Sequence, residues 1–157
     1  MHAATGLAAR ALAGQPRERL STIQKISRMN VGERIQLALK GTRDERLILV
    51  RDGVRVVSDA VLHSPRVTDL DMETYAAMRN VGESVLRGIA ANRKFMRRYA
   101  VKRLLTANPR CPIEVAMPLI KELLVNDLEN LSKNKNVSET VCKFAWRMLR
   151  SKRDKKD

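Results

Sequence analysis

The chain spells nearly the same tetrapeptide three times, and this repetition restricts its fold more than any other feature. The copies read N-V-G-E from Asn30, N-V-G-E from Asn80 and N-V-S-E from Asn136. Asn is a favoured helix N-cap, and a Glu three residues later can accept a hydrogen bond from the backbone N–H of the cap. Apolar residues at helical spacing follow each copy. We therefore expect each Asn to cap a helix that begins there.

Two longer similarities surround these tetrapeptides. Residues 71–85 resemble residues 127–141, which lie 56 positions later, at shared Asp, Glu, Asn and Val positions. Residues 56–66 resemble residues 100–110, which lie 44 positions later, and both stretches end in Ser/Asn-Pro-Arg. Proline ends a helix and favours extended geometry in the residue before it. Similarity at 44 to 56 residues is typical of a stack of helical repeats.

The rest of the chain also has helical periodicity. Apolar residues are mostly Ala, Val, Leu and Met, aromatic residues make up only 3%, and no strand pattern competes. Thr68 with Asp71 predicts an acidic capping box, and Pro118 is expected to kink its helix. The predicted helices span residues 16–28, 31–40, 43–51, 54–63, 68–79, 82–91, 95–106, 112–124, 126–133 and 138–152.

These patterns predict a single all-α domain over residues 16–150. Its form is a right-handed stack of about ten short antiparallel helices, a HEAT-like α-solenoid. Residues 1–15 are expected to be a flexible N-terminal segment, with a weak organelle transit peptide as the alternative, because they contain Arg and no acid. Residues 151–157 are expected to be a basic C-terminal tail.

The period resembles that of HEAT and armadillo repeats over roughly residues 31–150. The stretch L-T-A-N-P-R-C-P-I-E-V-A-M from Leu105 is also similar to the N-P-x-x-P-x-x-x-L style of the leucine-rich-repeat-variant family. These resemblances imply a stack of short helices. They imply no single activity, because HEAT-like folds include scaffolds, transport adaptors and a family of DNA glycosylases.

Residues suited to catalysis or metal binding are sparse. His63 is expected at a helix C-terminus, where a histidine meets the helix dipole favourably. Cys111 and Cys142 lie far apart without C-x-x-C spacing, so the sequence predicts neither a disulfide framework nor a zinc site. A reduced, cytoplasmic setting fits best. We predict a non-enzymatic protein without cofactor, metal or small-molecule substrate, and no apolar run reaches the roughly 18 residues of a membrane span.

Charge is the strongest functional signal in the sequence. The formal net charge is +14, which indicates a polyanionic partner. No acidic residue lies between Glu83 and Glu114, and this acid-free interval holds eight bases. The predicted nucleic-acid or polyanion-binding residues are these eight: Arg87, Arg93, Lys94, Arg97, Arg98, Lys102, Arg103 and Arg110.

The geometry of these bases depends on the local helix. A single helix over residues 93–100 would place its four bases on one face, opposite Phe95 and Tyr99. A turn near residues 92–95 is the alternative. A further alternative is a solvated surface on which the bases pair with acids of another repeat.

Three functions follow from these observations. The leading hypothesis is a module that docks its basic face on the backbone of duplex DNA or structured RNA. The low aromatic content argues against single-strand binding by base stacking. The alternative is an adaptor that binds an acidic protein surface. A HEAT-like DNA-modifying enzyme is the third, and it requires a cleft with a carboxylate near Trp146.

Overall fold

The structure is a computed structural model that describes residues 21–157, and its regular elements in that range are all helices. Residues 21–27 are helical and precede ten labelled helices. The helices are α2 (Val31–Lys40), α3 (Arg43–Leu49), α4 (Arg55–Leu62), α5 (Asp69–Ala77), α6 (Glu83–Ala91), α7 (Arg93–Met96), α8 (Tyr99–Ala107), α9 (Ile113–Ile120), α10 (Val125–Ser132) and α11 (Glu139–Asp154). The predicted all-α class and the helix number are confirmed. The flexible segment predicted at residues 1–15 and the predicted domain start at residue 16 lie outside the described residues.

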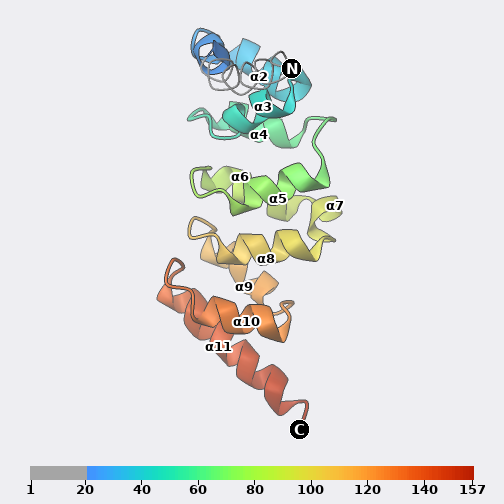
Figure 1. Ribbon diagram of the computed structural model, residues 1–157, viewed down its shortest axis with the longest axis vertical. Helices are drawn as coiled ribbons and strands as arrows, with labels where there is room; N and C mark the ends of the chain where they lie inside the picture. The colour runs from blue at the N-terminus through green and yellow to red at the C-terminus, as the bar shows by residue number, and fades with distance from the viewer. Residues whose placement is uncertain (1–20) are drawn as a thin grey trace, which may run out of the picture.

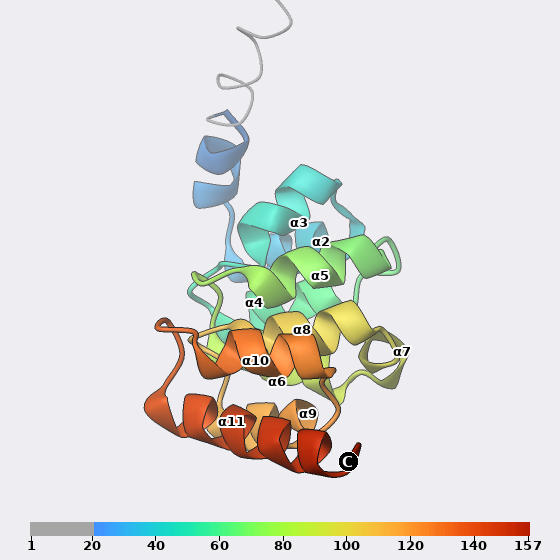
Figure 2. The same ribbon diagram turned by 60° about the horizontal axis from the view of Figure 1, so that its bottom comes forward.

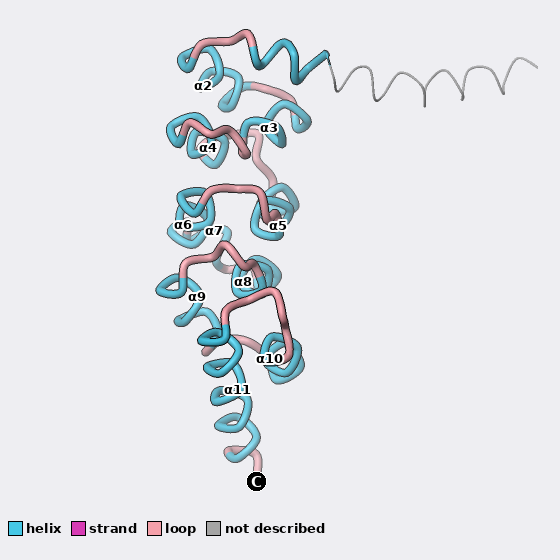
Figure 3. The backbone as a smooth tube through the Cα atoms, turned by 90° about the vertical axis from the view of Figure 1, so that its left-hand side faces the viewer, coloured by secondary structure: helices cyan, strands magenta, loops and turns pink. Residues whose placement is uncertain are grey.

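The helices form two columns that run the length of the molecule. Figure 1 shows them layered from the N-terminal to the C-terminal end, and Figure 3 shows α2, α4, α6, α9 and α11 in one column beside α3, α5, α8 and α10 in the other. Neighbours in a column pack on each other, as α2 does on α4 and α5 on α8. Each helix therefore buries its apolar face against the next pair along the chain.

The helices of the column that contains α2 begin at regular intervals along the sequence. Their N-caps are Asn30, Val54, Gly82, Pro112 and Ser138, which lie 24 to 30 residues apart. The repeated unit is therefore about half the predicted period of 44 to 56 residues. The 56-residue similarity spans two units. The 44-residue similarity relates α4 to α8, which stand in opposite columns, so it is not a unit of this stack.

Four of the connecting turns are built alike, and this explains the repeated letters. In each turn the residue before the N-cap packs on the core, as an apolar residue at that position commonly does. These residues are Val67, Val81, Cys111 and Val137. The turn, more than the tetrapeptide, is the repeated device.

The capping prediction is therefore right for one tetrapeptide and wrong for two. Asn30 caps α2, because its Oδ1 accepts from Glu33 N at 2.8 Å, while its Nδ2 donates to the Glu33 carboxylate at 3.0 Å. Asn80 and Asn136 do not cap helices, since α6 and α11 begin at the Glu of each copy. The valine that follows the Asn is drawn toward the core in these two turns, and this delays the helix.

In the two Ser/Asn-Pro-Arg turns, the residue before the proline ties the turn to the preceding unit. Ser64 Oγ donates to Leu39 O at 2.7 Å. Asn108 Nδ2 donates to both Ala76 O and Met78 O at 2.8 Å, at the end of α5. These carbonyls lack partners inside their own helices, so the turn of one unit supplies the C-terminal cap of a neighbour.

A buried ion pair joins two successive helices of the same column, α3 and α5, near the N-terminal end. Arg46 of α3 and Asp71 of α5 are both 4% exposed, and their side chains meet at 3.0 Å. Arg46 also donates to Gly41 O, and Arg43 contacts the other Asp71 oxygen at 3.1 Å. Thr68 and Asp71 form the predicted capping box of α5. Asp71 therefore serves both a helix cap and the ion pair.

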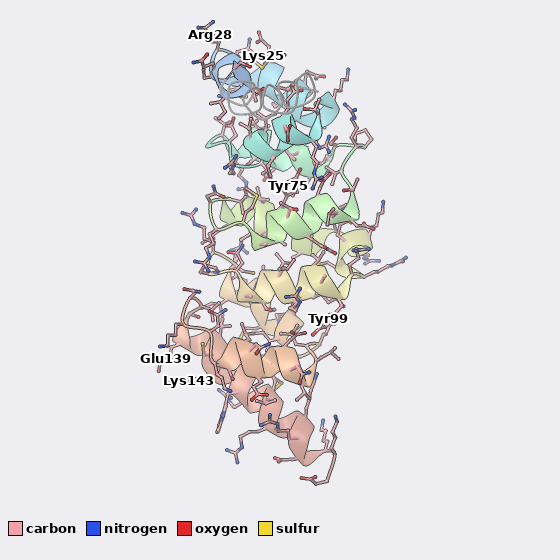
Figure 4. The ribbon with its side chains drawn as sticks, viewed as in Figure 1. Lys25, Arg28, Tyr75, Tyr99, Glu139 and Lys143 are labelled. Carbon is pink, nitrogen blue, oxygen red and sulfur yellow. The ribbon has the colours of Figure 1, made fainter. Side chains whose placement is uncertain are left out.

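Tyr99 caps the start of α10 and also contacts an acidic residue of that helix. Its hydroxyl donates to Asp127 and accepts from Leu124 N, which is the cap residue of α10 and has no side-chain cap of its own. Tyr99 lies at the same edge of the stack as the α9–α10 connection (Figure 4). Burial, followed by the bond to Asp127, raises the pKa of Tyr99, so the hydroxyl stays protonated and keeps both bonds.

Candidate polyanion interface

The centre of the predicted interface is the short helix α7, at the edge of the stack where the chain passes from α6 to α8 (Figure 1). Asn92 caps it, since its Oδ1 accepts from Lys94 N at 3.0 Å and from Phe95 N at 3.4 Å. Phe95 is 5% exposed and anchors the turn in the core. The cap and the anchor together leave Arg93, Lys94 and Arg97 exposed.

Residues 93–100 do not form one amphipathic helix, which was one of the two alternatives, and the helix predicted at residues 95–106 is divided between α7 and α8. α7 ends at Met96, and Arg98 has an extended conformation as the N-cap residue of α8. The chain bends on both sides of α7, at Asn92 and again at Arg97–Arg98, which is closer to the alternative of a turn. Phe95 and Tyr99 each bind a different part of the core, so one straight helix cannot serve both.

Four of the eight predicted bases are occupied by contacts with neighbouring units. Arg98 bridges Asp69 and Glu73 of α5, and Arg87 contacts Glu83 and Glu114. Lys102 pairs with Glu122 at 2.8 Å. Arg110 donates to the carbonyl oxygen of Val81 at 3.4 Å. The contacts of Arg87, Arg98 and Lys102 match the alternative in which the acids come from another repeat. Arg110 instead has a backbone partner and, among the described residues, no acidic one.

The other four bases have no acidic partner among the described residues, and all four are exposed: Arg93, Lys94, Arg97 and Arg103. The first three belong to α7 or its C-terminal end, and we call them the α7 cluster. Arg103 stands apart on α8, beside a hollow of about 110 Å³ that Asp127 and Asn130 also line. Of the eight bases, those that are exposed without a side-chain hydrogen bond or acidic partner in the described part of the chain are therefore the α7 cluster and Arg103.

The sequence-based prediction missed one exposed site on α11. Tyr75 and Phe95 are buried as expected of core aromatics, but Trp146 is 50% exposed. The guanidinium carbon of Arg150 lies 4.8 Å from the centroid of the Trp146 ring. An aromatic residue and an arginine four positions apart on a helix would have been the sequence signal for this pair.

Groups suited to catalysis are few in the described residues. His63 is the C-cap residue of α4, as predicted. No group of three or more His, Cys, Asp or Glu residues within residues 21–157 could hold a metal ion. Beside Trp146 lies an open hollow that contains Asp154, but its walls come from α11 and the residue that follows it. A base-flipping pocket encloses its base on several sides, which this hollow does not.

Cys111 gives a testable consequence of burial. Desolvation, with the nearby Glu114 carboxylate, raises the pKa of Cys111 to about 12. Because the thiolate is the reactive form, folded Cys111 should react with a thiol reagent at pH 8 far more slowly than after unfolding. A Cys142→Ser variant isolates the Cys111 signal. Equal rates in the folded and urea-unfolded protein would contradict the prediction.

The comparisons with known proteins add no family to this description. Searches of protein-family models, of curated proteins and of solved structures find no match to the chain. Among the described helices, none combines the length and the apolar character that crossing a bilayer requires. The fold and the surface define an all-helical protein with a cluster of unpaired bases at one edge.

Proposed function

We propose that this chain is a non-enzymatic helical-repeat module that docks on the phosphate backbone of duplex DNA or structured RNA. The observation that carries the proposal is the α7 cluster. Arg93, Lys94 and Arg97 are exposed, adjacent and without acidic partners among the described residues, in a chain of net charge +14. Acids of neighbouring units form ion pairs with Arg87, Arg98 and Lys102 instead.

The α7 cluster suits phosphate in two ways. Arginine presents a planar fork of donors that can contact two phosphate oxygens at once. The Asn92 cap and the buried Phe95 side chain fix the backbone of the short helix. Its basic side chains therefore extend from a backbone that is already ordered. Phosphate contacts of this kind release counterions, so the affinity should fall steeply as the salt concentration rises. They do not distinguish one nucleobase from another.

Charge reversal at α7 tests this proposal. A double variant, Arg93→Glu with Arg97→Glu, should weaken binding to a labelled duplex and reduce the slope of affinity against salt by about two, because each arginine neutralises one phosphate. Fluorescence anisotropy across a salt series gives both values. The matched control is Arg79→Glu with Lys135→Glu, which changes the net charge equally in turns at the opposite edge of the stack.

The control variant should bind more tightly than the α7 variant at every salt concentration. Equal losses in the two variants would mean that net charge alone attracts the duplex, and the α7 interface would be rejected. A salt-independent affinity would reject the nucleic-acid proposal itself. Competition by polyglutamate at a lower concentration than duplex would favour the alternative, an adaptor for acidic proteins.

A further inference from the structure

The exposed side of α11 carries a stripe that the α7 proposal does not use. Lys143, Trp146, Arg147, Arg150 and Asp154 fall within an arc of roughly 100° on this helix. The opposite side holds Val141, Ala145 and Leu149, which are buried. Figure 2 shows α11 in front of α9 and below α10, and Figure 4 places Lys143 at its outer edge.

Trp146 is unusual on this stripe because its large aromatic side chain is half exposed to solvent. Its ring meets the Arg150 guanidinium at 4.8 Å, so a flat apolar surface and a flat cationic surface lie together. Both surfaces can stack on a nucleobase. Trp and Arg are also the residues that most often carry binding energy at interfaces.

The surroundings of the pair supply charge for a nucleotide. An open hollow of about 480 Å³ lies beside it, lined by Trp146, Arg147, Arg150, Ser151, Asp154 and Lys155. Among the described residues, Arg147, Arg150 and Lys155 take part in no ion pair. Asp154 is the acceptor of the hollow, and a carboxylate accepts hydrogen bonds from the amino and imino groups of bases.

We infer that Trp146 and Arg150 form a stacking site for one unpaired nucleobase at the end of a duplex or at a duplex junction. Arg147 and Lys155 contact the phosphates beside that base, and Asp154 accepts from its N–H groups. The inference rests on the proposed docking of nucleic acid. One stacking pair serves one base, so the site recognises an end or a junction and not a long single strand.

An acidic protein segment fits this site less well. Its carboxylates could pair with the cations of the hollow, but they offer no flat ring to stack on the Trp146–Arg150 pair. A second copy of the chain fits worse, because the positively charged side chains of the two hollows would face and repel each other. A nucleotide combines a flat ring and a nearby anion, which are the two features that the Trp146–Arg150 pair and its neighbours can hold.

The experiment uses Trp146 as its own probe, since it is the single tryptophan of the chain. The ligands are a blunt-ended duplex and the same duplex with a short unpaired overhang. Stacking should quench tryptophan fluorescence with the overhang duplex and leave it nearly unchanged with the blunt one. The overhang should also bind roughly tenfold more tightly, within the range measured for base–aromatic stacking.

Two variants separate the site from general effects. Trp146→Leu should remove the preference for the overhang while salt-dependent binding of the blunt duplex stays. Trp146→Phe should keep most of that preference. Because the readout is a ratio between two duplexes, partial unfolding cannot imitate it. Arg93→Glu with Arg97→Glu should weaken binding of both duplexes alike.

Each outcome decides between the two proposals. Equal affinities for the two duplexes without quenching would overturn the stacking site and leave the α7 docking proposal intact. No salt-dependent binding of either duplex would overturn both. Stronger quenching by a polyglutamate peptide than by the overhang would assign the site to an acidic protein and overturn the nucleobase.

Discussion

Replacement of Asp71 with alanine should lower the free energy of unfolding by about 3–5 kcal/mol. The reason is the partner that is left behind. Arg46 is 4% exposed, and without Asp71 its guanidinium becomes a buried charge without a counter-ion. The capping box of α5 is lost in the same variant, because Asp71 also accepts from Thr68 N. Urea denaturation followed by circular dichroism measures the change.

Two controls separate the buried pair from general surface charge. Arg43 contacts the same carboxylate but is 63% exposed, so Arg43→Ala should cost no more than about 1 kcal/mol. Arg46→Met combined with Asp71→Asn removes both charges and keeps a capping side chain. This double variant should be more stable than Asp71→Ala, since no buried charge remains. A double variant that is less stable would contradict the argument.

Acid should reveal the same ion pair. Burial alone would raise the pKa of Asp71, but the hydrogen bonds from Thr68 and Arg46 outweigh it and lower the pKa below the ordinary 3.8. The stabilisation is therefore complete above pH 3.8 and is lost as the pH falls through the lower, folded value. The wild-type protein should lose more stability below about pH 4 than an Asp71→Asn variant does.

Replacement of Asn108 with alanine should cost about 2–4 kcal/mol, the second large effect. Asn108 is 5% exposed, and its amide serves two carbonyls at the end of α5. Removal of the amide leaves those acceptors buried without a donor. Its Oδ1 also accepts from Arg110 N at 2.9 Å and so holds the turn that leads to α9. Thermal and urea denaturation should agree on the loss.

The matched controls for Asn108 lie in the repeated tetrapeptides. Asn80 is exposed and its side chain makes no hydrogen bond among the described residues, so Asn80→Ala should change stability by less than about 0.5 kcal/mol. Asn30 is a true N-cap, and Asn30→Ala should cost about 1 kcal/mol. A large effect at Asn80 would mean that its copy of the tetrapeptide caps a helix after all.

Much of the helical framework could be predicted from local patterns. The bounds predicted for α2 are those observed, and Thr68, Asp71 and Ser/Asn-Pro-Arg mark real helix boundaries. Periodicity reports one helix at a time, so it could not show that α6 and α11 start late. That delay depends on Val81 and Val137 packing against other helices. The right-handed, HEAT-like form of the stack stays a prediction.

Less of the candidate site than of the fold could be predicted from the sequence. The acid-free interval correctly marked a basic segment, but charge pairing is a property of space. Glu73 and Arg98 are 25 residues apart and bond at 2.9 Å, and no local pattern announces that contact. The charge pattern of this interval also gave no indication that the chain bends on both sides of α7. The binding role of the eight bases stays a prediction that the variants above can test.

The turn-to-helix hydrogen bonds have a consequence for how fast the protein can fold. Within the described residues, the side-chain hydrogen bond that spans the most sequence joins Asn108 to Ala76, 32 residues away. Closing a short loop costs little chain entropy, and chains rich in local contacts reach their transition state quickly. Each pair of helices can therefore find its neighbour as soon as the next pair exists. Assembly can start at any point of the stack and spread from there.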